Sequence, residues 1–154
     1  MPLNNRSPVE SEGSTIVKVL AVSPIEDDHN LLNRILPPPR WNVYRASSIS
    51  EAMSRVKRHW PVPLILCEQN LVNETWKELL DNVILMPEPP LLIVTSRLAD
   101  EQLWAEALSL GAYDVLAKPF DEGEIQRCLT SGWSHWQRDH LTVAPGLLHA
   151  ASGM

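Results

Sequence analysis

The chain has 154 residues, of which 44% are hydrophobic, and this is enough for one domain with a buried core. Its formal net charge of −6 disfavours direct binding to nucleic acid, which needs a basic surface. No apolar run approaches the length of a membrane span, so no contact with a membrane is expected. Cys67 and Cys128 lie in apolar segments without metal-like spacing, which favours reduced core thiols and a cytoplasmic location.

Apolar runs that alternate with helical stripes predict five βα units between residues 16 and 138. The expected strands are 16–22, 41–46, 63–67, 91–95 and 113–117, and a helix is expected after each. Such a sequence predicts a doubly wound parallel sheet of the α/β class, with the flavodoxin-like strand order 2-1-3-4-5. Residues 1–15 are polar and are predicted to be a flexible lead. Residues 139–154 show no clear periodicity and are predicted to be a C-terminal tail or linker.

Capping residues predict where the helices begin. Ser23, Pro24 and Glu26 fit the N-cap, N1 and N3 positions of the first helix. Asn73 is expected to cap the third helix. His29 falls on the first helix and is expected to be exposed there.

The most informative stretch is residues 110–120, Leu-Gly-Ala-Tyr-Asp-Val-Leu-Ala-Lys-Pro-Phe. Gly111 fits a left-handed helix C-cap, and a short strand follows it. Lys118 projects from the end of that strand, where open α/β sheets place their sites. The motif resembles the last strand of receiver domains, the phosphoacceptor modules of two-component response regulators. The resemblance covers residues 17–136 and implies the same (βα)5 fold.

The resemblance also assigns site positions. Receivers phosphorylate an aspartate after the third strand, beside a magnesium ion held by two acidic residues after the first. These positions fall on Glu68 and on Ser23 and Pro24. The hydroxyl after the fourth strand falls on Thr95, and the lysine after the fifth on Lys118. Because neither Ser23 nor Pro24 supplies a carboxylate, no metal site is expected.

Two acidic features remain near that site. Asp27 and Asp28 match the first helical turn, so we interpret them as partners of the helix N-terminus rather than as metal ligands. Glu68 is either a partial mimic of the phosphoryl group or an ordinary surface glutamate at a strand end. Glu68 and Lys118 are expected to face each other as an exposed pair.

The family's switch and partner face are also altered. The aromatic switch position falls on Val115, which cannot swing as a ring does. In receivers, the fourth helix, fifth strand and fifth helix form the commonest partner face. Trp104 and Leu108 fall there and are candidates for an interface, with ordinary packing as the alternative.

These observations predict an atypical pseudo-receiver domain in two-component or phosphorelay signalling. It is expected to be a non-enzymatic, cofactor-free interaction module that works without phosphorylation. Its expected partner is a signalling protein, its own output domain or a second copy bound through the fourth-helix face. One alternative is a working phosphoacceptor that uses Glu68, or Asp27 and Asp28. Another is a cofactor-binding flavodoxin relative, although acidic residues 26–28 would repel a phosphate.

Overall fold

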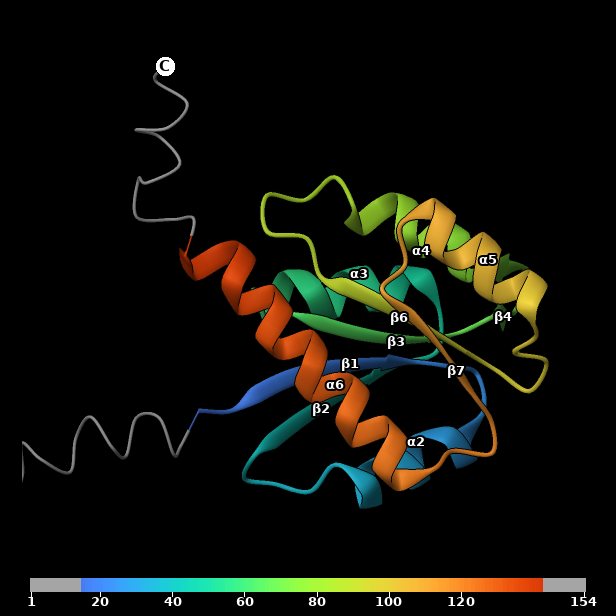
Figure 1. Cartoon of the computed structure of the whole chain (residues 1–154), viewed down its shortest axis with the longest axis horizontal. Coiled ribbons are helices and arrows are strands. Elements are labelled where there is room, and N and C mark those ends of the chain that lie inside the picture. The colour runs from blue at the N-terminus through green and yellow to red at the C-terminus, as the bar shows by residue number, and fades with distance from the viewer. Residues whose placement is uncertain (1–14, 143–154) are drawn as a thin grey trace, which may run out of the picture.

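The computed structural model describes residues 15–142, so residues 1–14 of the predicted lead and 143–154 of the predicted tail lie outside that range. Five parallel strands form one sheet in the order β2-β1-β3-β6-β7, which is the predicted topology (Figure 1). The strands are β1 (Val17–Val22), β2 (Trp41–Ala46), β3 (Leu64–Glu68), β6 (Leu91–Ser96) and β7 (Asp114–Ala117). The helices are α2 (Glu26–Ile35), α3 (Ile49–Arg58), α4 (Trp76–Val83), α5 (Glu101–Leu110) and α6 (Glu122–Gln137), which continues into a π-helical turn, η1 (Arg138–Thr142).

The helices cover both faces of the sheet. Helices α3, α4 and α5 lie over one face, and α2 and α6 lie over the other (Figure 1). Successive side chains of β1 point to opposite faces of the sheet. Leu20 and Val22 therefore lie in the core under α3, α4 and α5, and Val19 and Ala21 lie in the core under α2 and α6. A central strand is buried on both faces, and this explains why β1 is apolar except for Lys18, which is half-buried near its start and whose ammonium donates to the carbonyl of His59. No helix within residues 15–142 is long and apolar enough to cross a membrane.

Local signals place the last βα unit as predicted. Gly111 ends α5 with φ of 115°, a left-handed conformation that glycine adopts without a steric penalty. The side chain of Asp121 accepts a hydrogen bond from the backbone N–H of Glu124 and so caps α6. Lys118 therefore lies between a fixed strand and a fixed helix.

Two predicted helix starts are wrong. Helix α2 begins at Glu26, after an N-cap residue, Ile25, that makes no side-chain cap. Asn73 does not cap α4; it has a left-handed φ of 63° in the turn of a small hairpin, β4 (Asn70–Leu71) with β5 (Glu74–Thr75). Thr75 caps α4 instead, in a reciprocal capping box with Glu78.

Candidate functional site

The carboxyl ends of β1, β3, β6 and β7 lie at the same end of the sheet, and the side chain of Lys118, which follows the outer strand β7, reaches from there to α2 and to the end of β3. Its backbone N–H bonds the carbonyl of Ser96, which fixes the residue after β7 to the neighbouring strand β6. Its Nζ lies 2.8 Å from Asp28 Oδ2 and 2.8 Å from Glu68 Oε1. The side chains of Lys118, Asp28 and Glu68 are only 3%, 10% and 12% exposed. The ammonium is thus buried between two carboxylates that come from different elements.

Thr95 completes this network. Glu68 and Thr95 are register partners on β3 and β6, and Thr95 Oγ1 donates to Glu68 Oε1 at 3.1 Å. The same carboxylate oxygen therefore accepts from a hydroxyl and an ammonium. The prediction that Glu68 and Lys118 face each other is confirmed, but the prediction of an exposed pair is wrong, because the helices and loops around the edge bury it.

Asp28 is the residue whose place the sequence interpretation missed. It lies in the first turn of α2, as predicted, but it is buried and directed at Lys118 rather than serving only the helix terminus. Ser23 Oγ donates to Asp28 Oδ2 at 2.7 Å and accepts from the backbone N–H of Ile25. The hydroxyl of Ser23 therefore orients the Asp28 carboxylate, and Ser23 is not the N-cap of α2. Asp27 is exposed, as are Pro24 and Glu26.

The residues at this edge do not fit a magnesium ion. Magnesium prefers octahedral coordination by oxygen. Pro24 offers no side-chain ligand, the hydroxyl of Ser23 is hydrogen-bonded to Asp28, and both nearby carboxylates already bind the Lys118 ammonium. Within residues 15–140, no group of three or more His, Cys, Asp or Glu side chains is arranged to hold a metal ion. The positive charge at this edge is supplied by the chain itself.

The family model described as the response regulator receiver domain matches residues 20–130, most of the chain. The chain belongs to this family. Receiver domains are signalling modules of two-component systems, and they are generally not enzymes. The receiver domain is 26% identical over 125 residues to the regulatory protein VirG of Rhizobium radiobacter. That match covers 80% of this chain but only 46% of VirG, so the chain spans about half the length of its relative.

Solved structures share the fold. The signal receiver domain of a putative LuxO repressor from Vibrio parahaemolyticus has a TM-score of 0.76 at 16% identity, covering 83% of this chain and 98% of that one. CheY in a CheX–CheY–BeF3–Mg complex from Borrelia burgdorferi gives a TM-score of 0.69 at 23% identity, covering 76% of this chain and 89% of that one. Likeness at this level of identity establishes the architecture of the receiver domain and nothing about its partners.

The remaining predicted residues lie on the face of α5, β7 and α6. Trp104 is 51% exposed, and Leu108 and Val115 are half-buried. Trp104 and Val115 both line a shallow cavity of about 480 Å³ that also includes Arg127 of α6. The structure thus brings Trp104 and Val115, the residue at the family's switch position, to one cavity, and Glu68 does not line it.

Proposed function

We propose that this receiver domain signals through protein–protein contacts without phosphorylation of the usual kind. The observation that supports the proposal is the position of Lys118 Nζ, 2.8 Å from both Asp28 and Glu68. A receiver needs a divalent cation and a lysine to neutralise the transferring phosphoryl group. Here the lysine is held by two carboxylates, and the residues matching the acidic pair, Ser23 and Pro24, carry no charge.

The network supports one fixed state rather than a switch. Glu68 stands at the acceptor position and brings one negative charge, where a phosphoryl group would bring about two. Thr95 and Lys118 both bind it in the unmodified chain. In a receiver, the hydroxyl and the ammonium at these positions would bind the phosphoryl group, and here Thr95 and Lys118 already bind Glu68. We therefore propose that Glu68 holds the loops in a permanent signalling-competent arrangement.

The face built by α5, β7 and α6 is the proposed contact surface. A half-exposed tryptophan beside a half-buried leucine is the composition of an interface anchor. Among the structural relatives, CheY is in complex with CheX, and the NtrC4 receiver domain is a dimer. By analogy, we propose that this face binds a signalling protein, an output domain or a second copy of the chain.

The first test is chemical. The protein is incubated with acetyl phosphate and magnesium chloride, and its intact mass is measured, with a receiver domain that carries the acceptor aspartate as the positive control. The expected result is an unchanged mass under conditions that modify the control. A labile phosphoryl adduct on Glu68 would instead support the working-phosphoacceptor alternative.

The second test concerns the contact surface. Self-association is measured by sedimentation for the unmodified chain, Trp104→Ala and Trp60→Ala. Trp60 is a suitable control because it is 36% exposed and lies before β3 rather than on α5. If the chain dimerises through the proposed face, Trp104→Ala weakens the dimer by about ten-fold or more and Trp60→Ala leaves it unchanged. Equal effects of both substitutions would argue against the assigned face.

A further inference from the structure

Strand β2 is an outer strand of the sheet, and no strand within residues 15–142 pairs with its free side (Figure 1). Unlike a central strand, it is only partly buried. Residues 42–45 are exposed or half-buried, whereas residues 64–67 of β3 are buried throughout. An unpaired edge presents backbone N–H and C=O groups to any second strand that reaches it. The hydrogen bonds around β2 show which of these groups are free.

Val43 lies in the middle of this edge with both backbone groups free. The carbonyl of Ala46, at the end of β2, accepts from the N–H of Ser23, which follows β1. Because the backbone groups of successive residues point to alternate sides of a strand, those of Val43 and Arg45 point away from β1. The carbonyl of Arg45 accepts from Arg55 Nε at 3.1 Å. The N–H of Arg45 and both groups of Val43 have no partner among the described residues.

Strand β2 and helix α3 form a basic edge on an acidic chain. Residues 40–60 contain five Lys or Arg side chains but one acidic residue, Glu51, whereas the net charge of the whole chain is −6. Lys57 and Arg58, in the last turn of α3, are exposed and form no ion pair within the described part of the chain. Lys18 of β1 donates to the carbonyl of the residue that ends α3, at 2.9 Å, and no described carboxylate pairs with it.

An aromatic contact places these charges beside β2. The ring of His59, the C-cap residue of α3, stacks on Tyr44 of β2 with the ring centroids 3.9 Å apart. Desolvation lowers the pKa of this ring, and so do the nearby charges of Arg58, Lys18 and Arg55. The ring is therefore neutral near neutral pH, and the positive charge next to β2 comes from the three longer side chains.

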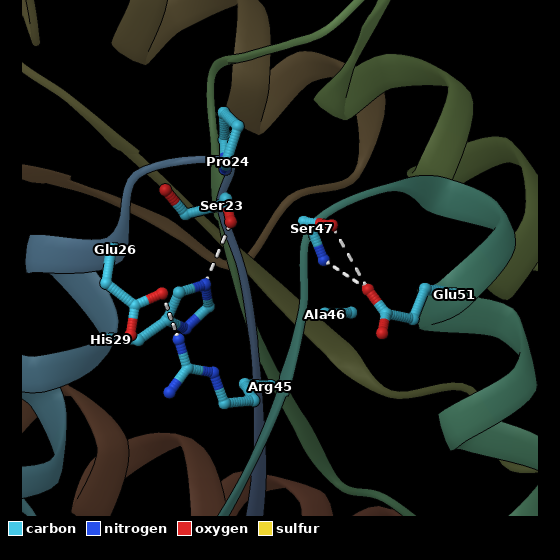
Figure 2. A pocket seen from close by; sticks show the side chains of 8 residues that line it. All are labelled: Ser23, Pro24, Glu26, His29, Arg45, Ala46, Ser47 and Glu51. Carbon is cyan, nitrogen blue, oxygen red and sulfur yellow. Dashed lines mark hydrogen bonds and ion pairs between the residues drawn. The ribbon is translucent and has the colours of Figure 1, made fainter.

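The carboxylates at the other end of β2 already have partners. Figure 2 shows Arg45 directed at Glu26 of α2, and Glu51 of α3 bonded to Ser47. His29 was expected to be exposed on α2, and that expectation is wrong, because it is only 5% exposed and its Nε2 lies 2.8 Å from a backbone carbonyl oxygen. It takes no part in the edge. The unpaired positive charge therefore lies beside the first half of β2, at the C-terminal end of α3.

We propose that the free edge of β2 binds an acidic segment of a partner protein as an additional strand. The backbone of that segment pairs with Val43 and with the N–H of Arg45, and its carboxylates lie beside Arg58 and Lys18. In strand addition, main-chain hydrogen bonds give affinity and side chains give specificity. Basic side chains also keep a second copy of the same edge away, because like charges repel. This surface is separate from the face of α5, β7 and α6, and it does not depend on how the domain responds to phosphorylation.

The test is a titration of the whole chain with the acetylated, amidated peptide Glu-Val-Glu-Val-Glu, followed by amide chemical shifts. Glu-Pro-Glu-Pro-Glu is the matched control, because it has the same charge and proline cannot donate to a strand ladder. Lys-Val-Lys-Val-Lys tests the sign of the charge. We expect saturable shifts at Val43 and Arg45 with the Glu-Val peptide at a Kd of about 1 mM, and binding at least about ten-fold weaker for the other two. Equal binding of the Glu-Val and Glu-Pro peptides, or no saturable shift up to about 10 mM, would overturn the proposal.

Charge reversal assigns the surface. Arg58→Glu should weaken binding of the Glu-Val peptide by about ten-fold, because attraction becomes repulsion. Arg97→Glu is the control, since Arg97 is also exposed, has no ion pair among the described residues and follows β6, which β1 and β3 separate from β2. Circular dichroism checks folding, and Lys57→Glu at the neighbouring exposed position is the second variant. Equal weakening by Arg58→Glu and Arg97→Glu would show that only net charge matters, and would refute the assigned edge.

The ring of His59 gives a second readout. Carboxylates beside it oppose the cations that lower its pKa, so the bound Glu-Val peptide should raise the pKa of His59, followed by the ring proton shifts. An unchanged pKa at saturation would place the acidic side chains elsewhere and contradict the proposal. Octathymidylate separates the two classes of acidic partner. Tighter saturable binding of this oligonucleotide at β2 would assign the edge to nucleic acid instead of a protein strand.

Discussion

Removing the Lys118 ammonium is expected to destabilise the domain strongly. In Lys118→Met, two buried carboxylates, on Asp28 and Glu68, remain close together without the cation that lies 2.8 Å from each. Breaking a buried ion pair by deleting one partner costs about 3–5 kcal/mol, because the remaining charge is neither solvated nor paired. That is a large part of the 5–15 kcal/mol of a typical domain. At about 3 °C per kcal/mol, Tm should fall by roughly 10–15 °C.

The matched control is Lys77→Met. Lys77 also pairs with a carboxylate, that of Glu106 on α5, but the two side chains are 47% and 43% exposed. Water solvates the glutamate when its partner is removed, so the expected loss is within about 1 kcal/mol. The free energies of unfolding of both variants are measured in urea, with equal m-values as the check that the same surface unfolds.

The comparison can refute the account. If Lys118→Met and Lys77→Met lose similar stability, the Lys118 ammonium is not needed to neutralise the buried carboxylates of Asp28 and Glu68. Glu68→Gln separates charge from hydrogen bonding, because the amide oxygen can still accept from Thr95 and Lys118. It should therefore cost less than Lys118→Met, and a larger loss would contradict the same reasoning.

Other features give independent predictions. Gly132→Ala should lower the free energy of unfolding, measured in urea, by about 1–3 kcal/mol, because the new Cβ would lie 2.9 Å from Leu64 Cδ2. Gly123→Ala should cost less, because its Cβ meets chiefly the movable side chain of Arg127, 3.2 Å away. Thr75→Ala should lower the free energy of unfolding by about 1 kcal/mol, because α4 loses its N-terminal cap. An unchanged urea midpoint would show that the capping box does not stabilise the domain. Burial raises the pKa of the Cys67 thiol and raises that of Cys128 to about 12. The unfolded chain therefore loses these protons first as pH rises above about 8.5, and stability should fall by up to about 1.4 kcal/mol per thiol and pH unit. Replacing Cys67 by Ala should flatten that slope, and an equally steep slope in the variant would contradict it.

The fold could be predicted because its signals are local. The glycine stop at Gly111 and the position of Lys118 after a short strand follow from neighbouring residues alone. Parallel strands must place their carboxyl ends together, so the meeting of Glu68, Thr95 and Lys118 followed from the predicted strand order. These features tolerate an error of one residue in an element boundary.

The burial of the site could not be predicted because it depends on the rotation of one helix. Each residue of shift turns a side chain by about 100° around the helix axis. Starting α2 at Glu26 directs Asp28 and His29 inward, where Asp28 meets Lys118 and His29 meets the Ser23 carbonyl. The serine–proline pair looked like a helix start, although the hydroxyl of Ser23 serves Asp28 instead. A signal was present in the sequence, namely an acidic residue and a histidine side by side on a helix that must cover a sheet.

The most direct test of the central claim is a magnesium titration of the unmodified protein. The claim is that the Lys118 ammonium takes the place of a divalent cation between the carboxylates of Asp28 and Glu68. Amide chemical shifts of Asp28, Glu68, Thr95 and Lys118 are followed up to about 20 mM magnesium chloride, with sodium chloride at matched ionic strength. The account predicts the same small, unsaturated shifts in both salts. Saturable shifts at these residues with magnesium alone would contradict it.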